Sequence, residues 1–157
     1  MPLLEIPYPA IDPVLIRLGS LQIKWYGLLF VAGFLVGNWL LQRLSKEGRL
    51  KTDKDGVSDL LVVIMIGIIL GGRLGYVCFY DLPKFVAEPL EVFKIWKGGL
   101  SFHGGLIGAF CAVVFFTRRR MIPLMNVMDA CAASAGPGIF FVRCANFING
   151  ELWGKPT

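Results

Sequence analysis

The chain has 157 residues, of which 55% are hydrophobic and only 17% are charged, and its mean hydropathy is +0.64. These values exclude a soluble domain with a solvated surface and are typical of a membrane protein. The formal net charge of +5 does not indicate nucleic-acid binding, because the basic residues occupy short loops between apolar runs and form no stripe on a soluble face.

The amino-terminal segment is interrupted by prolines, at Pro2, Pro7, Pro9 and Pro13. Its apolar residues are typical of a lead-in that lies along a membrane interface before the chain enters the bilayer. The segment lacks the basic start and the small-residue cleavage site of a removable signal peptide. We therefore expect the first long apolar run to remain in the mature protein.

Four apolar runs approach or reach the roughly 20 residues that cross a bilayer core. They are Trp25–Gln42, Leu60–Tyr80, Gly98–Thr117 and Ile122–Val142. The sequence therefore predicts an all-α fold, a polytopic transmembrane helix bundle with about four spans. Because no linker or low-complexity tract divides the chain, we expect residues 1–157 to form a single membrane domain.

Two loops between these runs are rich in basic residues. The first carries Arg43, Lys46, Arg49, Lys51 and Lys54, and the second carries Arg118, Arg119 and Arg120. The positive-inside rule assigns both loops to the cytoplasm, which puts the amino terminus outside. The charges of the loop between the second and third runs nearly cancel, as those of an exterior loop can.

Glycine recurs at four-residue spacing within the expected helices. The pairs and triplets are Gly33 and Gly37, Gly67 with Gly71 and Gly75, and Gly104 and Gly108. Small residues on one helix face let neighbouring backbones approach closely. The adjacent pairs Gly71-Gly72 and Gly104-Gly105 flank Arg73 and His103, so the bare backbone there either packs helices or makes room for a ligand. The sequence leaves both interpretations open.

The cysteines, Cys78, Cys111, Cys131 and Cys144, lie in or beside apolar runs. They show no CxxC spacing, and a single histidine cannot complete a metal site with them. We expect buried thiols and no metal centre. Cys144 is the one thiol with an adjacent cation, Arg143, and is the only candidate for a reactive nucleophile.

Two polar side chains lie where hydrocarbon is expected, or at its edge. His103 begins the third run, and it either hydrogen-bonds another helix or takes part in proton transfer or ligand binding. Arg73 lies deep in the second run, where an arginine costs ~2.5–3.5 kcal/mol on insertion scales and needs a partner. Asp129 in a structural ion pair and a lipid phosphate are the two candidate partners.

Further polar residues cluster where the fourth run ends. Arg143 lies at the same expected depth as His103, and its guanidinium could bind a phosphodiester through two parallel hydrogen bonds, which lysine cannot. Asn146, Asn149 and Glu151 follow it and could bind hydroxyls or orient a cation, although Asn149-Gly150 alone is a common turn. Tyr26 begins the first run, as interfacial tyrosines or ligand-contacting ones do.

These residues form a pattern that resembles the motif of bacterial prolipoprotein diacylglyceryl transferases. The pattern is Arg143-x-x-Asn146-Phe147-x-Asn149-x-Glu151-x-x-Gly154. Three further blocks resemble that family in the same order, namely Trp25-Tyr26-Gly27-Leu28, Gly71-Gly72-Arg73-Leu74-Gly75-Tyr76 and Ser101-Phe102-His103-Gly104-Gly105-Leu106-Ile107-Gly108. The resemblance runs from about Trp25 to the end of the chain.

The resemblance implies a multi-pass enzyme of the bacterial inner membrane with a seven-helix fold. Such an enzyme moves the diacylglyceryl group of phosphatidylglycerol to the lipobox cysteine thiol of a preprolipoprotein, which is the first step of lipoprotein maturation. The expected partners are therefore phosphatidylglycerol, the lipobox peptide and membrane lipids, with no nucleic acid, no metal and no organic cofactor. By the same resemblance, this chain corresponds to the amino-terminal portion of a longer enzyme.

The resemblance also implies roles for individual residues in a site that faces the periplasmic leaflet. His103 and Arg143 map to catalytic positions, and Tyr26, Asn146, Glu151 and Gly154 map to positions around the lipid. We add Arg73 and Gly104 as substrate-binding candidates from their own positions in the sequence. The chain departs from the family pattern at Val142, where glycine is usual, and a β-branched side chain there could narrow the approach of a headgroup.

The implied reaction assigns one task to each catalytic candidate. His103 would remove the proton from the thiol, and Arg143 would stabilise negative charge on the departing phosphate. In the alternative assignment His103 binds the headgroup and another group takes the proton. Two hypotheses from other classes are a lipid or solute transporter, whose charges line a pathway, and a helix-packing assembly factor.

Overall fold

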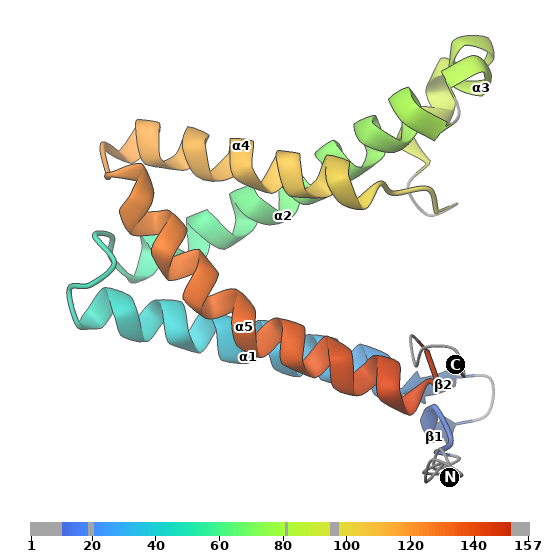
Figure 1. Cartoon of the computed structure of the whole chain (residues 1–157), viewed down its shortest axis with the longest axis horizontal. Helices are drawn as coiled ribbons and strands as arrows, with labels where there is room; N and C mark the ends of the chain where they lie inside the picture. The colour runs from blue at the N-terminus through green and yellow to red at the C-terminus, as the bar shows by residue number, and fades with distance from the viewer. Residues whose placement is uncertain (1–10, 19–20, 81, 95–97, 152–157) are drawn as a thin grey trace, which may run out of the picture. The chain divides into compact units, whose positions relative to one another are not determined.

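The computed structural model describes residues 11–18, 21–80, 82–94 and 98–151 (Figure 1). A small hairpin of β1 (Val14–Leu18) and β2 (Leu21–Lys24) precedes helices α1 (Trp25–Lys46) and α2 (Lys54–Tyr80). Two short elements follow, α3 (Leu82–Ala87) and the 3-10 helix η1 (Pro89–Phe93). Helices α4 (Phe102–Arg120) and α5 (Leu124–Ile148) complete the described chain. The predicted all-α membrane fold is confirmed, with the hairpin as an addition.

Three of the helices are long and apolar enough to cross a membrane, namely α1, α2 and α5, with 22, 27 and 25 residues. Helix α4 has 19 residues and ends on three arginines, so its crossing of the membrane stays a prediction. Many large apolar side chains on the three long helices are exposed, including Phe30 and Leu70. A helix that is apolar all round is typical of a membrane span.

Helix α2 begins earlier than the apolar run that predicted it. It starts at Lys54 rather than Leu60, because the polar turn before the run is already helical. The Asp53 carboxylate accepts a hydrogen bond from the backbone N–H of Gly56 at 2.9 Å, which satisfies one of the free amides of the first turn. The hydropathy of a sequence therefore locates the membrane-crossing part of a helix and misses its polar extension.

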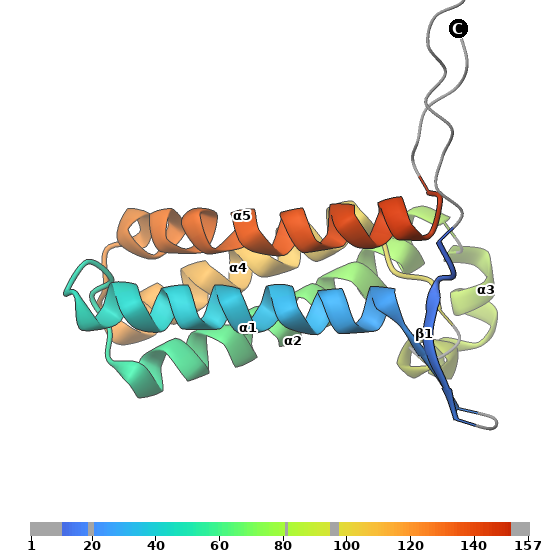
Figure 2. The ribbon, with the colours of Figure 1, turned by 90° about the horizontal axis from the view of Figure 1, so that it is seen from below.

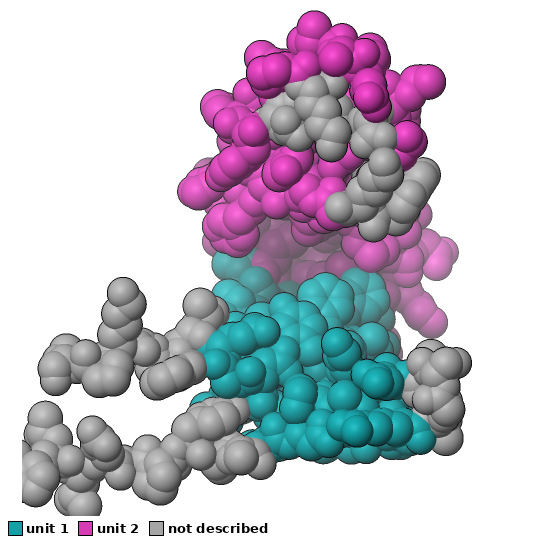
Figure 3. Space-filling model, turned by 90° about the vertical axis from the view of Figure 1, so that its right-hand side faces the viewer, with its two compact units in different colours: residues 1–40, 132–157 teal, residues 41–131 magenta. Residues whose placement is uncertain are grey.

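The described chain forms two compact units, drawn in teal and magenta in Figure 3. Unit 1 comprises residues 1–40 and 132–157, and unit 2 comprises residues 41–131. In unit 1 the two helical segments run antiparallel and side by side (Figures 1 and 2). A Cβ atom added at Gly33 would lie 3.1 Å from the Cα atom of Gly138, and one at Gly37 would lie 3.3 Å from the Ser134 carbonyl oxygen. The helices thus meet at small residues.

Unit 2 is built on the contact between α2 and α4, which glycines make on both sides. A Cβ atom at Gly67 would lie 2.5 Å from the Gly108 carbonyl oxygen, and one at Gly75 would lie 2.8 Å from the Gly104 Cα atom. The same holds for Gly71, which faces the backbone of Gly104. These glycines therefore pack helices, and a contact of Gly104 with a ligand stays a prediction.

The two basic loops lie at one end of unit 2, where Asn126 at the start of α5 binds the first loop and Arg120 of the second forms ion pairs. The side-chain amide of Asn126 accepts from the Lys51 backbone N–H at 2.8 Å and donates to the Arg49 carbonyl oxygen at 2.7 Å. Arg120 forms ion pairs with Asp59 and, at 3.6 Å, with Asp53. Because both loops lie at the same end, one membrane side can receive both, as the positive-inside rule requires.

The cysteines differ from their prediction as buried thiols. Cys78 and Cys111 are exposed, while Cys131 and Cys144 are half-buried, and all four are free. The prediction is wrong for the two exposed residues. Its physical error is that an apolar residue of a membrane helix need not lie inside the protein, because lipid solvates its side chain as well as a protein core does.

Candidate functional site

The predicted site residues divide between the two units. Unit 1 holds Tyr26, Arg143, Asn146 and Glu151, and unit 2 holds Arg73, His103 and Gly104. Gly154 lies outside the described residues. Because Arg143 and His103 belong to different units, their meeting around one ligand stays a prediction.

The polar cluster of unit 1 is built on the carboxyl end of α5, which closes in a Schellman motif. The backbone N–H of Glu151 donates to the Asn146 carbonyl oxygen at 2.8 Å, and that of Gly150 donates to the Phe147 carbonyl oxygen at 3.1 Å. Gly150 has φ +67°, a left-handed conformation that glycine adopts without strain. The expected turn at Asn149-Gly150 is therefore present, and it folds Glu151 back toward the helix.

The cap gathers three polar side chains at the end of α5. The amide of Asn149 donates to the Glu151 carboxylate at 3.3 Å, and Asn146 is buried, with 8% of its surface exposed. The side-chain oxygen of Asn149 is buried and accepts no hydrogen bond from the described residues. A buried acceptor without a donor is costly unless a ligand or water supplies one.

Arg143 lies one helical turn before Asn146, so the two side chains emerge from neighbouring positions on α5. Its side chain is exposed, and among the described residues it forms no ion pair. A guanidinium without a carboxylate at the end of a membrane-spanning helix is a ready partner for an external anion. This end of α5 therefore offers a cation, a buried amide acceptor and a carboxylate together.

Tyr26 is the second residue of α1 and is 37% exposed. Its hydroxyl has no hydrogen-bond partner within the described part of the chain. The helix start is fixed by the hairpin, because the Trp25 backbone N–H donates to the Pro13 carbonyl oxygen at 3.1 Å. An interfacial anchor and a ligand contact both fit this placement.

His103 is the second residue of α4 and is exposed. Its ring contacts Phe102 edge-to-face, with 5.7 Å between ring centroids, and it makes no hydrogen bond to any described residue. The alternative of a histidine bonded to another helix is thus not what unit 2 contains. The imidazole nitrogens are available for a ligand or a proton.

The start of α4 is fixed by Ser101, a residue that sequence reasoning did not single out. Ser101 is the N-cap, and its hydroxyl oxygen accepts from the Gly104 backbone N–H at 3.2 Å. Its own backbone N–H donates to the Gly72 carbonyl oxygen on α2 at 2.8 Å. A serine directly before an apolar helical run was the signal that could have found it.

Arg73 has partners that neither sequence hypothesis included. The side chain is buried on α2, and it donates to the carbonyl oxygens of Val92, Gly98 and Gly99. Asp129 is exposed and forms no ion pair with it. Backbone carbonyl oxygens thus accept several of the hydrogen bonds that this buried guanidinium can donate. A contact of Arg73 with a substrate stays a prediction.

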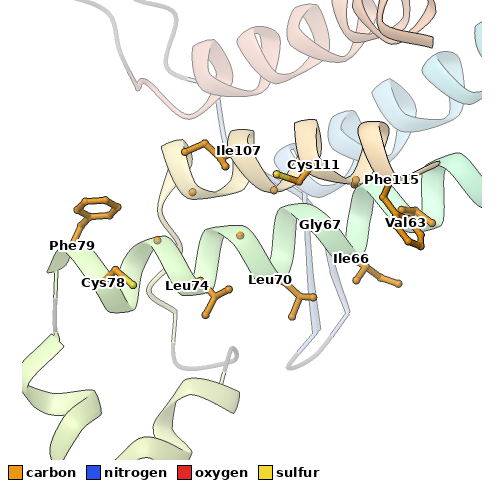
Figure 4. Close-up of a pocket in the computed structure, with 15 residues that line it drawn as sticks. Val63, Ile66, Gly67, Leu70, Leu74, Cys78, Phe79, Ile107, Cys111 and Phe115 are labelled. Carbon is orange, nitrogen blue, oxygen red and sulfur yellow. The ribbon is translucent and has the colours of Figure 1, made fainter. Parts of the chain in front are cut away.

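A groove of unit 2 runs along the α2–α4 contact and has a volume of about 670 Å³ (Figure 4). Its lining is almost entirely apolar, and it includes Gly104 together with Leu70, Leu74, Ile107 and Phe115. Its lining residues include no charged side chain. Gly104, predicted to bind substrate, contributes backbone to this groove while its Cα atom packs against Gly75.

Metal ligands do not gather in the described residues. No group of three or more histidine, cysteine, aspartate or glutamate side chains there could hold a metal ion.

Comparison with known proteins matches nearly the whole chain to one family. Residues 13–157 match the sequence model of a family described as prolipoprotein diacylglyceryl transferase. A curated relative from Rhodospirillum rubrum is 50% identical over 99% of this chain and 57% of its own length. Relatives from Methylocella silvestris and Mesorhizobium japonicum are 49% and 44% identical over 97% and 100% of this chain, and over 58% and 57% of their own lengths. All three are named phosphatidylglycerol–prolipoprotein diacylglyceryl transferase. The chain thus spans a little over half the length of the curated relatives it matches.

Proposed function

We propose a function from one premise: the chain belongs to the prolipoprotein diacylglyceryl transferase family. The proposed activity is transfer of the diacylglyceryl group from phosphatidylglycerol to the lipobox cysteine thiol of a preprolipoprotein. Within it, residues 1–157 are the amino-terminal membrane portion of a longer enzyme. The observation that carries the proposal is Arg143, a guanidinium without an ion pair among the described residues, one turn before the buried amide of Asn146.

In the proposed reaction the thiol sulfur forms a bond to the sp³ glycerol carbon while the bond from that carbon to the phosphate oxygen breaks. Glycerol phosphate leaves with the bonding electrons, and the thiol proton goes to a base. Arg143 binds the phosphodiester through paired hydrogen bonds, and it stabilises the charge that grows on the departing phosphate more than it stabilises the starting ester.

His103 is the proposed base. Its imidazole is exposed and makes no hydrogen bond within the described residues, so a ring nitrogen is free to accept the thiol proton. The competing assignment, in which His103 binds the lipid headgroup, uses the same nitrogens as donors. Proton transfer predicts a pH-dependent rate that disappears with the imidazole, whereas headgroup binding predicts a change in lipid affinity.

The amide cluster at the end of α5 is proposed to bind the glycerol of the headgroup. The buried side-chain oxygen of Asn149 lacks a donor among the described residues, and a glycerol hydroxyl supplies one. The Glu151 carboxylate is held by Asn149 and orients either a hydroxyl or the nearby cation. Tyr26, at the start of α1, and Gly154 are proposed to complete the contacts with the lipid.

The orientation follows from the charges of the loops. Because Arg120 of the second basic loop forms an ion pair with Asp53 beside the first at one end of unit 2, we assign that end to the cytoplasm. The amino terminus and the ends of α1 and α5 that carry Tyr26 and Arg143 then belong to the outer side. In a bacterial inner membrane this is the periplasmic leaflet, where a secreted preprolipoprotein presents its thiol.

The test incubates a lipobox peptide with phosphatidylglycerol vesicles that contain the full-length enzyme. Mass spectrometry of the peptide then measures thioether formation. We expect the peptide mass to rise by one diacylglyceryl group, with one glycerol phosphate released per event. Vesicles of phosphatidylcholine are the control, because they offer an ester without the glycerol headgroup. Movement of lipid or solute across the vesicle without thioether would instead support a transporter and contradict the proposal.

A further inference from the structure

Arg73 acts as a clamp on the segment that leads into α4. Its side chain is 5% exposed. The Nε atom donates to the Val92 carbonyl oxygen at 2.9 Å, and the Nη1 atom donates to those of Gly98 and Gly99 at 2.7 and 3.1 Å. The guanidinium carbon also lies 5.9 Å from the centre of the Tyr76 ring. One residue of α2 thus holds three points of a segment that is distant in sequence.

The clamped backbone has a conformation that requires glycine. Gly98 and Gly99 have φ +82° and +79°, so two consecutive residues are left-handed and turn their carbonyl oxygens toward the same guanidinium nitrogen. Gly72, the neighbour of Arg73, accepts the Ser101 backbone N–H. Adjacent residues of α2 therefore fix both ends of the stretch 98–101.

This stretch determines where α4 begins. Ser101 is the N-cap of the helix, and His103 is the second residue of that helix. The Arg73 guanidinium thus holds Gly98 and Gly99, and the backbone leads from these residues to Ser101, which binds Gly72 and caps the turn that carries the imidazole. We propose that Arg73 is a positioning residue of the proposed transferase, which holds the start of α4 so that His103 keeps its place relative to the reacting thiol.

The inference rests on the proposed function and separates two roles for Arg73. A guanidinium whose Nε and Nη1 atoms already bind carbonyl oxygens of the chain is poorly placed to grip a phosphate as well. A positioning role predicts a loss in turnover with lipid binding retained, because a small displacement of a catalytic group slows chemistry steeply. Direct phosphate binding predicts a rise in the KM for the lipid.

The first test compares Arg73→Lys and Arg73→Met with wild type in the full-length enzyme. Lysine donates from a single point and cannot span the three carbonyl oxygens. We expect kcat to fall by about tenfold to a hundredfold in both variants, with the KM for phosphatidylglycerol changed by less than about threefold. A raised KM with unchanged kcat, or wild-type values of both, would overturn the proposal.

A second variant decides the matter if the arginine variants fail to fold. Gly98→Ala keeps the cation and meets no heavy atom within 4 Å, but it forces an L side chain to φ +82°. We expect the same loss of kcat with the KM retained. Gly48→Ala is the matched control, because Gly48 also has open space and a φ of +71° but lies in the basic loop after α1. Equal losses in both variants would contradict positioning and indicate general destabilisation.

A third measurement does not depend on activity. Diethylpyrocarbonate modifies exposed imidazoles, and the rate at His103 can be followed by mass spectrometry of its peptide. We expect Arg73→Lys to raise that rate by about threefold or more, because the first turn of α4 is released. If wild type forms no thioether, the proposed function fails while this rate still tests the clamp. If wild type is active and neither the rate nor the kinetics change in Arg73→Lys, the clamp is refuted.

Discussion

The backbone N–H of Glu151 donates to the carbonyl oxygen of Asn146 at 2.8 Å, and this bond ends α5 while it brings a carboxylate back toward a buried amide. The bond exists because Gly150 between them is left-handed, with φ +67°. A helix cap and a cluster of polar side chains are therefore one structure. Gly150, which occupies an unspecified position of the motif, is then as important for this local structure as the polar residues beside it.

Gly150→Ala tests this dependence. An L residue in the left-handed region costs about 1–2 kcal/mol, so the cap should weaken and the Asn149–Glu151 contact should loosen. We expect faster hydrogen exchange at the Glu151 amide and lower thioether formation by the full-length enzyme. Gly138→Ala is the control, because a Cβ there meets nothing within 4 Å and its φ is not positive; that variant should be neutral or more stable. Unchanged exchange in Gly150→Ala would contradict the role of the cap.

Arg143→Lys keeps the positive charge and removes the paired donors. Because the proposed role is to stabilise charge on the leaving phosphate, we expect kcat for thioether formation to fall by about a hundredfold or more. Arg119→Lys provides the comparison, since Arg119 is an exposed arginine in the last turn of α4 and should tolerate lysine. Turnover like that of wild type in Arg143→Lys would remove the paired-hydrogen-bond hypothesis.

His103→Gln distinguishes the base from the headgroup binder. If His103 takes the thiol proton, the rate of the wild-type enzyme falls on acidification, because a protonated imidazole cannot accept another proton. The variant should be slower by about a hundredfold, and this acid dependence should be absent. The measurement is kcat/KM against pH for both proteins. A variant with the same pH profile and a raised KM for the lipid would assign His103 to headgroup binding.

Gly67→Ala tests the packing of α2 on α4 independently of activity. The added Cβ would lie 2.5 Å from the Gly108 carbonyl oxygen, so the helices must move apart. We expect a loss of about 1–3 kcal/mol in the free energy of unfolding in detergent. At Gly105 the added Cβ would lie 3.5 Å from the nearest atom, the Ile68 carbonyl oxygen, so Gly105→Ala should be close to neutral. Equal stability of the two variants would show that the glycine contact is not tight.

Features that are local in sequence were predicted well. The apolar runs located α1, α2 and α5, because the number of residues that crosses a bilayer is a property of the chain alone. The turn at Asn149-Gly150 was expected for the same reason, since glycine there permits a left-handed residue in any fold. The two basic loops were identified from their charge, and their assignment to the cytoplasm stays a prediction. The hydrogen bonds between Asn126 and the backbone of Arg49 and Lys51 could not be predicted, because these residues are far apart along the chain.

The amino-acid sequence by itself determined that this is a membrane helix protein of the transferase family, since hydropathy, loop charge and the motif from Arg143 to Gly154 are all written in consecutive residues. Only the tertiary structure decided what the polar and small residues touch. Arg73 binds the carbonyl oxygens of Val92, Gly98 and Gly99, although the sequence offered a carboxylate and a phosphate. The physical reason is that a buried cation takes the acceptors that chain folding brings within about 3 Å of it, and that proximity is not encoded at any one position.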